Sequence, residues 1–174
     1  MNIFITDESP TKSAFYLDDK RVVKMILEST QMLCTAINEA GHSTPYKTTH
    51  KNHPSNIWVR QSKQNWIWLW EHAYELMDRY QAVYDKQHKC RSIIIDLIDN
   101  FENVLPDIGR TPFANCAAHA GKNISYKHIA SVPEAYRRYL VDRWNGDVRT
   151  PTWKKRRMPE WITIDKEGRF VYSG

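Results

Sequence analysis

The sequence predicts a mainly α protein: a single compact helical domain of about four main helices that ends in a short β-hairpin. Three observations favour this class. Apolar residues recur every three or four positions over several long stretches, which is the spacing of one helix face. Capping residues and prolines bound these stretches. Alternation of apolar and polar residues around a glycine is confined to the end of the chain.

The first part of the chain predicts one long helix. Residues 1–6 are apolar and are expected to form a buried extended start, and Ser9-Pro10 opens a turn or a helix. The long helix should run from Asp18 to about Ala40, with Gly41 ending it in the usual C-terminal position. Its apolar face is expected to consist of Val22, Ile26, Leu33 and Ile37.

Three further helices follow. A second long helix is expected from about Ser55 to Lys86, and a third over 90–104, stopped by a proline. The segment 109–127 is irregular. Ser131 should cap a fourth helix that runs to residue 144, because Glu134 completes a capping box three positions later. Residues 161–172 predict the hairpin. The second helix should carry an apolar stripe made of Trp58, Trp66, Leu69, Ala73, Leu76, Tyr80 and Tyr84.

Composition predicts one domain over residues 1–174, with the basic C-terminal segment 149–174 as a candidate for a peripheral position. The net charge is +5, and residues 149–157 hold five basic side chains and no acid. Clustered charge of this kind suits phosphate contacts, although it is also typical of a solvated basic segment. No apolar run approaches the ~20 residues of a membrane helix, and the start lacks a signal-peptide pattern. A cytoplasmic location without a membrane partner is therefore expected.

Cysteine usage fits a reducing compartment. The three cysteines, Cys34, Cys90 and Cys116, are odd in number and widely spaced, which argues against a disulfide framework. There is no Cys-x-x-Cys pair, so a structural zinc site is not expected. No metal and no other cofactor is predicted.

The polar loop from Pro45 to Pro54 is the strongest functional signal, because a connecting loop has no packing reason to concentrate titratable side chains. Its His50 and His53 could be general acid/base groups or could contact phosphates or bases. They could also be metal ligands, completed by another histidine or a cysteine, or could simply cap the next helix.

The first long helix has a second, polar face, on which Arg21, Lys24, Glu28 and Gln31 are three or four residues apart. Such a stripe is often only a solvated face with weak ion pairs. It becomes a catalytic candidate if it faces the histidine loop. The predicted catalytic residues are Asp19, Arg21, Lys24, Glu28, His50 and His53.

Aromatic and basic side chains alternate at the start of the second helix and again in the segment 150–161. Aromatic faces can stack on bases and basic groups can hold phosphates, whereas tryptophans at helical spacing are more often core. No Walker loop, dinucleotide turn or serine elbow is present, which disfavours nucleotide hydrolysis and hydride transfer. The predicted nucleic-acid-binding residues are Lys47, Asn52, Trp58, Arg60, Asn65, Trp153, Lys154, Lys155, Arg156 and Arg157.

The chain resembles a set of small proteins common in tailed-phage genomes. The resemblance lies in the Met-Asn-Ile-Phe start, the segment 19–28, the loop 45–54 and the Pro-Glu-Trp of 159–161. It covers most of the chain but names no activity. It implies the host cytoplasm as the location if the chain is phage-encoded.

The order of elements also resembles the phage pyrimidine-dimer DNA glycosylases of the endonuclease V type, which are small, basic and mainly helical. That resemblance places Asp18 or Asp19 where the family has its catalytic glutamate, and matches residues 151–154 to a C-terminal segment that contacts DNA. The family's nucleophile is the amine of a processed N-terminus that begins with a small residue. Here Asn2 follows Met1, so the resemblance leaves Lys20 or Lys24 to supply the amine.

These observations predict an enzyme that acts on DNA, namely a DNA glycosylase or a related base-modifying hydrolase of the repair type, with DNA as its partner. Two alternatives remain at this point. The chain could be a non-catalytic phage effector that binds a host protein or nucleic acid, or an enzyme that acts on a free nucleotide. Nothing in the sequence predicts the oligomeric state.

Overall fold

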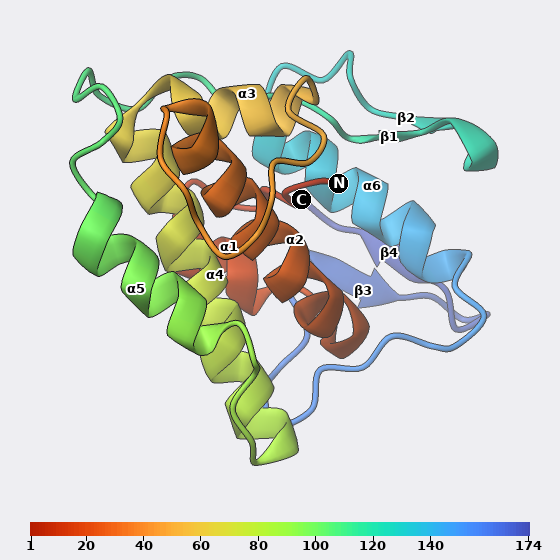
Figure 1. Ribbon diagram of the computed structural model, residues 1–174. Coiled ribbons are helices and arrows are strands. Elements are labelled where there is room, and N and C mark those ends of the chain that lie inside the picture. Colours follow the sequence, from red (N-terminus) through yellow and green to blue (C-terminus); the bar gives the residue numbers. More distant parts are fainter.

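The computed structural model describes residues 1–174 and confirms a mainly α fold (Figure 1). A central pair of long antiparallel helices is flanked on one side by a shorter helix and on the other by a helix that carries the C-terminal hairpin. The helices are α1 (Pro10–Phe15), α2 (Asp19–Glu39), α3 (Pro54–Gln61), α4 (Lys63–Tyr84), α5 (Arg91–Phe101), the 3-10 helix η1 (Ala120–Lys122) and α6 (Val132–Asn145). The strands are β1 (Ala118–His119), β2 (Ile124–Ser125), β3 (Ile162–Ile164) and β4 (Phe170–Tyr172).

The N-terminal segment is buried over residues 3–6, as predicted, but it is not fully extended, because the Ile5 N–H donates to the Ile3 carbonyl at 3.0 Å. Ile3, Phe4, Ile5 and Thr6 are all buried without belonging to a helix or sheet. Side chains satisfy their backbone groups, since the Ser13 hydroxyl donates to the Phe4 carbonyl at 3.0 Å and the Arg137 Nε donates to the Thr6 carbonyl at 2.7 Å. This segment therefore joins the first helices to α6.

The helices α2 and α4 form the centre of the core. The apolar face predicted for α2 is buried, and Trp66 of α4 donates its indole N–H to the Leu33 carbonyl of α2 at 3.2 Å. The predicted ends of α2 are also confirmed. Asp18 caps its start, and Gly41 takes a left-handed conformation (φ 93°) just after its end. The core is one continuous cluster of 36 buried apolar residues, which stabilises α1 to α6 together.

The single helix predicted for residues 55–86 is wrong, because it breaks into α3 and α4 at Ser62. Ser62 is extended (φ −152°, ψ 157°), and its hydroxyl accepts from the Asn65 N–H at 3.1 Å to cap α4. The N–H of Lys63 donates to the Pro106 carbonyl at 2.8 Å. A loop that is distant in the sequence therefore stabilises the separation of α3 from α4. The third helix is shorter than predicted, and 109–127 contains the small β1–β2 pair.

The C-terminal segment is part of the core rather than peripheral. The predicted hairpin is present as the antiparallel pair β3–β4, and α6 packs against β4. Trp161, Ile162 and Phe170 are buried, and the Trp161 and Trp144 rings stack with centroids 5.7 Å apart. The three cysteines are free, and no helix is long and apolar enough to span a membrane.

A buried histidine makes the stability of this fold depend on pH. His72 in α4 is 1% exposed, and burial lowers its pKa from 6.5 to about 4. Between pH 6.5 and pH 4, His72 is protonated in the unfolded chain but stays neutral in the folded chain. The free energy of unfolding therefore falls as the pH falls. Acidification from pH 7 to pH 4 is expected to cost about 3 kcal/mol at this residue alone.

Urea unfolding at pH 7, 5 and 4 measures this loss. In His72→Gln the part of the loss due to His72 should disappear, whereas His42→Gln, at an exposed histidine, should keep the wild-type pH dependence. An unchanged pH dependence in His72→Gln would contradict the assignment.

Candidate functional site

Side chains from two helices hold the backbone of the loop 45–54, which we call the histidine loop. Asn38 of α2 donates its amide to the Tyr46 carbonyl at 2.8 Å, and the Thr35 hydroxyl accepts from the Thr49 N–H at 3.2 Å. Asn56 of α3 donates to the His50 carbonyl at 2.9 Å. A loop fixed at three points presents its side chains in one arrangement, which is the condition for a preorganised site.

The two loop histidines have different roles. His50 is exposed and has a left-handed backbone (φ 48°), and its Nδ1 lies 2.7 Å from the Thr49 hydroxyl. His53 caps α3, where its Nδ1 accepts from the Ser55 N–H at 3.2 Å. The neutral ring of His53 therefore carries its hydrogen on Nε2, which is left free to act as a donor.

The environment keeps His53 neutral. Burial lowers the pKa of His53, and the positive charges of the Met1 amino group, His50 and Lys127 lower it further, while Glu28 opposes them. These influences show that groups from the N-terminal segment, α2 and the histidine loop lie within electrostatic range of one imidazole.

Glu28 lies between two amines. One of its oxygens, Oε2, accepts from the Asn2 N–H at 3.0 Å and lies 3.7 Å from the amino nitrogen of Met1. Its other oxygen, Oε1, lies 3.7 Å from the Nζ of Lys24. The Glu28 side chain is 17% exposed, whereas that of Lys24 is 69% exposed. We call the groups of Met1, Lys24, Glu28 and His53 the Glu28 cluster.

Polar groups surround the Glu28 cluster on its inner side. The hydroxyl of Tyr136 donates to the Asn2 side chain at 2.6 Å, and Asn2 in turn donates to the Cys116 carbonyl at 3.3 Å. The Ser55 hydroxyl donates to the Cys116 sulfur at 3.6 Å. The sequence-based prediction missed Met1, Asn2, Ser55, Cys116 and Tyr136, because nothing local in the sequence shows that the N-terminal segment passes beside α2.

Asp19 and Arg21 do not join the Glu28 cluster, so the expectation of one site containing all six predicted catalytic residues is wrong. Asp19 is nine residues before Glu28, about two and a half helical turns, and so lies on the opposite face of α2. It is buried and pairs with Arg156 at 2.9 Å. Arg21 is buried between Asp18 at 3.0 Å and Asp147 at 2.9 Å.

Four of the predicted nucleic-acid contacts are structural instead. Trp58 and Asn65 are buried, and Asn65 donates to the Trp58 carbonyl at 2.7 Å. Trp153 donates its indole N–H to the Tyr16 carbonyl at 3.0 Å, and the Arg156 side chain is 2% exposed. The burial of Trp58, Asn65 and the Arg156 side chain does not fit contact with a nucleic acid, and the half-buried Trp153 is held by a backbone carbonyl. The exposed members of the predicted set are Lys47, Asn52, Lys154, Lys155 and Arg157, while Arg60 is half-buried and donates to the Lys51 carbonyl.

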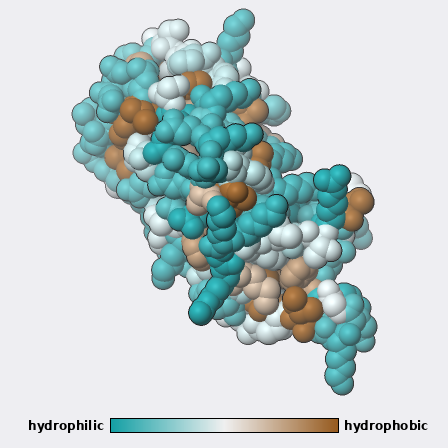
Figure 2. All heavy atoms as spheres, turned by 90° about the horizontal axis from the view of Figure 1, so that it is seen from below, coloured by the Kyte–Doolittle hydropathy of each residue, from teal (hydrophilic) through white to brown (hydrophobic).

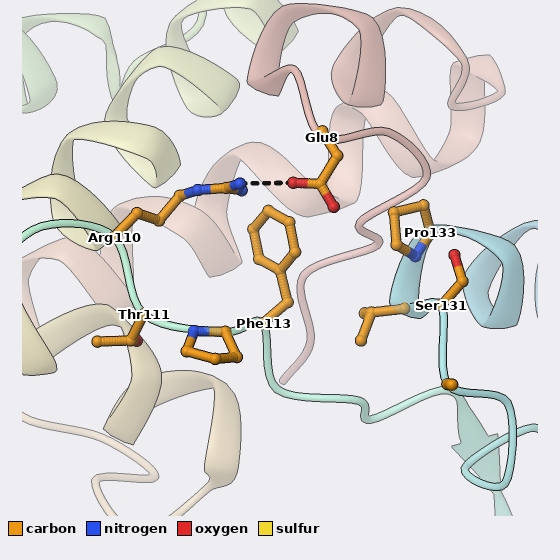
Figure 3. A pocket seen from close by; sticks show the side chains of 9 residues that line it. Glu8, Arg110, Thr111, Phe113, Ser131 and Pro133 are labelled. Atoms are coloured by element: carbon orange, nitrogen blue, oxygen red, sulfur yellow. Dashed lines mark hydrogen bonds and ion pairs between the residues drawn. The ribbon is translucent and has the colours of Figure 1, made fainter.

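The surface has hollows elsewhere. The one in Figure 3, of about 450 Å³, lies beside Phe113 and the start of α6, and its charged groups, Glu8 and Arg110, already pair with each other at 2.6 Å. A second, of about 460 Å³, lies at the start of α2 and includes Asp19 and Lys154. The Glu28 cluster lines neither. No three His, Cys, Asp or Glu side chains gather as a metal site.

Comparison with known proteins gave no match to any family model, to any curated protein or to any solved structure.

Proposed function

We propose that the chain is a DNA base-excising enzyme, a glycosylase whose chemistry takes place at the Glu28 cluster. The observation that carries the proposal is a largely buried carboxylate with an amine 3.7 Å from each oxygen and a neutral imidazole in electrostatic range. An amine nucleophile beside a carboxylate can displace a base at a sugar carbon through a covalent intermediate.

The proposed step begins with attack of a neutral amine on C1′ of the deoxyribose. The bond between C1′ and the base nitrogen breaks, and the base leaves with the bonding electrons and takes up a proton. Glu28 stabilises the positive charge that develops on the sugar and accepts the proton that the amine releases. The C1′–O4′ bond then breaks as the nitrogen lone pair forms the C1′=N imine, and O4′ takes up the proton held by Glu28 as the sugar ring opens. Water hydrolyses this imine and the ring closes again, which leaves an abasic site and the free amine.

The Met1 amino group is the favoured nucleophile of the two amines. It lies 3.7 Å from Oε2 of Glu28, and the Met1 side chain is only 4% exposed, against 69% for that of Lys24. His53 offers its Nε2–H as a hydrogen-bond donor, either to the leaving base or to a sugar oxygen.

Positive side chains around the cluster suit a DNA backbone. Lys24 and Lys127 are exposed, and Lys127 is close enough to lower the pKa of His53. Phosphate contacts of this kind supply affinity without sequence preference and weaken as salt rises.

The test is excision by the purified protein on duplexes that carry one pyrimidine dimer, one oxidised base or one alkylated base. Abasic sites should form on one class of lesion, and sodium borohydride should trap a protein–DNA adduct by reducing the imine. A variant with Gly-Ser placed before Met1 moves the α-amine and should lose trapping, whereas Lys24→Gln should keep it. Absence of abasic sites and of adducts on every duplex would contradict the proposal and favour a non-catalytic binder.

A further inference from the structure

The hollow at the start of α2 is a second place where distant segments meet. Its volume is about 460 Å³, within the range of ligand sites. It is formed by the first residues of α2, by Tyr84 at the end of α4 and by the loop 147–154 that follows α6. These segments come together at the lower end of the molecule in Figure 1. Figure 2 views that end from below and shows a largely hydrophilic face with small, separate apolar patches.

The acids at the hollow are neutralised from inside the protein. Asp18 accepts from Arg21 at 3.0 Å and from the Trp144 indole at 2.7 Å. Asp147 accepts from Arg21 at 2.9 Å. Both oxygens of Asp19 are also occupied, by Arg156 at 2.9 Å, by the Thr152 hydroxyl at 2.7 Å and by the Lys154 N–H at 3.0 Å. These carboxylates are therefore not free to hold a cation.

The basic side chains at the same hollow remain available. Arg149 and Lys154 are exposed and make no ion pair, and Lys20 is 68% exposed with its Nζ 3.7 Å from Asp147. With the two buried arginines, five basic residues face three acids, so the hollow has a positive excess. The hollow of Figure 3 differs, because its only arginine is already paired. Because the acids are already paired and the exposed basic side chains are not, the hollow should attract an anionic ligand.

The remaining wall of the hollow suits an aromatic ring. Tyr84 is 39% exposed there, and the buried Pro151 also lines the hollow, so an exposed aromatic ring is available for a flat ligand to lie on. The hydroxyls of Thr150 and Thr152 add polar edges. A ligand with a phosphate at one end and a base at the other would satisfy both parts of the lining.

We propose that this hollow binds a nucleoside phosphate, with the phosphate held by Lys20, Arg149 and Lys154 and the base against Tyr84. The ligand is either a free nucleotide or one unit of a DNA strand, since both carry the same chemistry. The proposal is independent of base excision at the Glu28 cluster, because it concerns binding alone.

Isothermal titration of the full chain with dTMP, dAMP, thymidine and inorganic phosphate tests it. One nucleotide should bind per chain, and thymidine and phosphate should each bind at least about tenfold more weakly. Arg149→Ala and Lys154→Ala should weaken nucleotide binding by about tenfold or more, while Arg110→Ala, in the hollow of Figure 3, should leave it unchanged. Tyr84→Ala should weaken binding, and Tyr84→Phe should retain it.

A four-residue oligothymidylate distinguishes the two sources of ligand. Binding at least as tight as that of dTMP indicates a DNA strand, and binding of dTMP alone indicates a free nucleotide. No saturable binding, binding of inorganic phosphate as tight as that of dTMP, or undiminished binding by Arg149→Ala and Lys154→Ala would overturn the proposal. Glu28→Gln should bind like the wild type, so a failure of excision and a failure of this site remain distinguishable.

Discussion

Replacing Glu28 by glutamine is expected to slow base excision by about 10²- to 10⁴-fold, the contribution typical of a positioned acid/base group. Glutamine keeps the size of the side chain and can still accept the Asn2 N–H with its amide oxygen. It removes the negative charge beside the Met1 amino group and Lys24. The variant therefore cannot accept the proton of the attacking amine and cannot stabilise the positive charge that develops on the sugar. Single-turnover excision with enzyme in excess, on the lesion that the wild type cuts, measures the effect.

Glu39→Gln is the matched control. Glu39 ends the same helix and pairs with Lys51 at 3.5 Å, but it is remote from the N-terminal amine. Its replacement should change the excision rate by less than about twofold, as expected for a surface ion pair. A Glu28→Gln protein that is folded and keeps more than about half of the wild-type rate would exclude Glu28 from the chemistry.

Replacing Arg21 by methionine is expected to lower the free energy of unfolding by about 3–5 kcal/mol, the cost of leaving a buried charge without its partner. The Arg21 side chain is 6% exposed and bridges Asp18 at 3.0 Å and Asp147 at 2.9 Å. Methionine fills much of the volume but leaves both carboxylates unpaired on its side. Urea unfolding at pH 7 measures the loss.

The control for this prediction is an exposed arginine in a comparable ion pair. Arg169 pairs with Asp165 at 3.0 Å, but its side chain is 66% exposed. Arg169→Met should therefore cost no more than about 1 kcal/mol. If Arg21→Met and Arg169→Met lost similar amounts, the buried network would not be the support of α2 that its contacts indicate.

Local patterns predicted the helices well, because periodicity and caps are local properties. The spacing of Val22, Ile26 and Leu33 and the cap at Asp18 were sufficient to predict α2. The break at Ser62 depends on a contact between Lys63 and Pro106, more than forty residues away, and no glycine or proline marks it. The burial of the C-terminal segment is likewise a tertiary effect, carried by the packing of Trp161 on Trp144.

The candidate site was predictable only in part. Glu28 and His53 were named from residue type and loop composition, but their grouping depends on the path of residues 1–6, which no local pattern reveals. The separation of Asp19 from Glu28 could have been deduced, since residues nine apart lie on opposite faces of a helix. The prediction that Trp58 contacts nucleic acid failed because a buried indole at helical spacing serves the core.

The most direct test of the amine–carboxylate site is the location of the trapped adduct. After borohydride trapping, nuclease and trypsin digestion followed by mass spectrometry should place the reduced sugar on the amino group of Met1, in the N-terminal peptide, and Glu28→Gln should give no adduct. An adduct on a lysine remote from Glu28, such as Lys154, or trapping that survives in Glu28→Gln, would contradict the account.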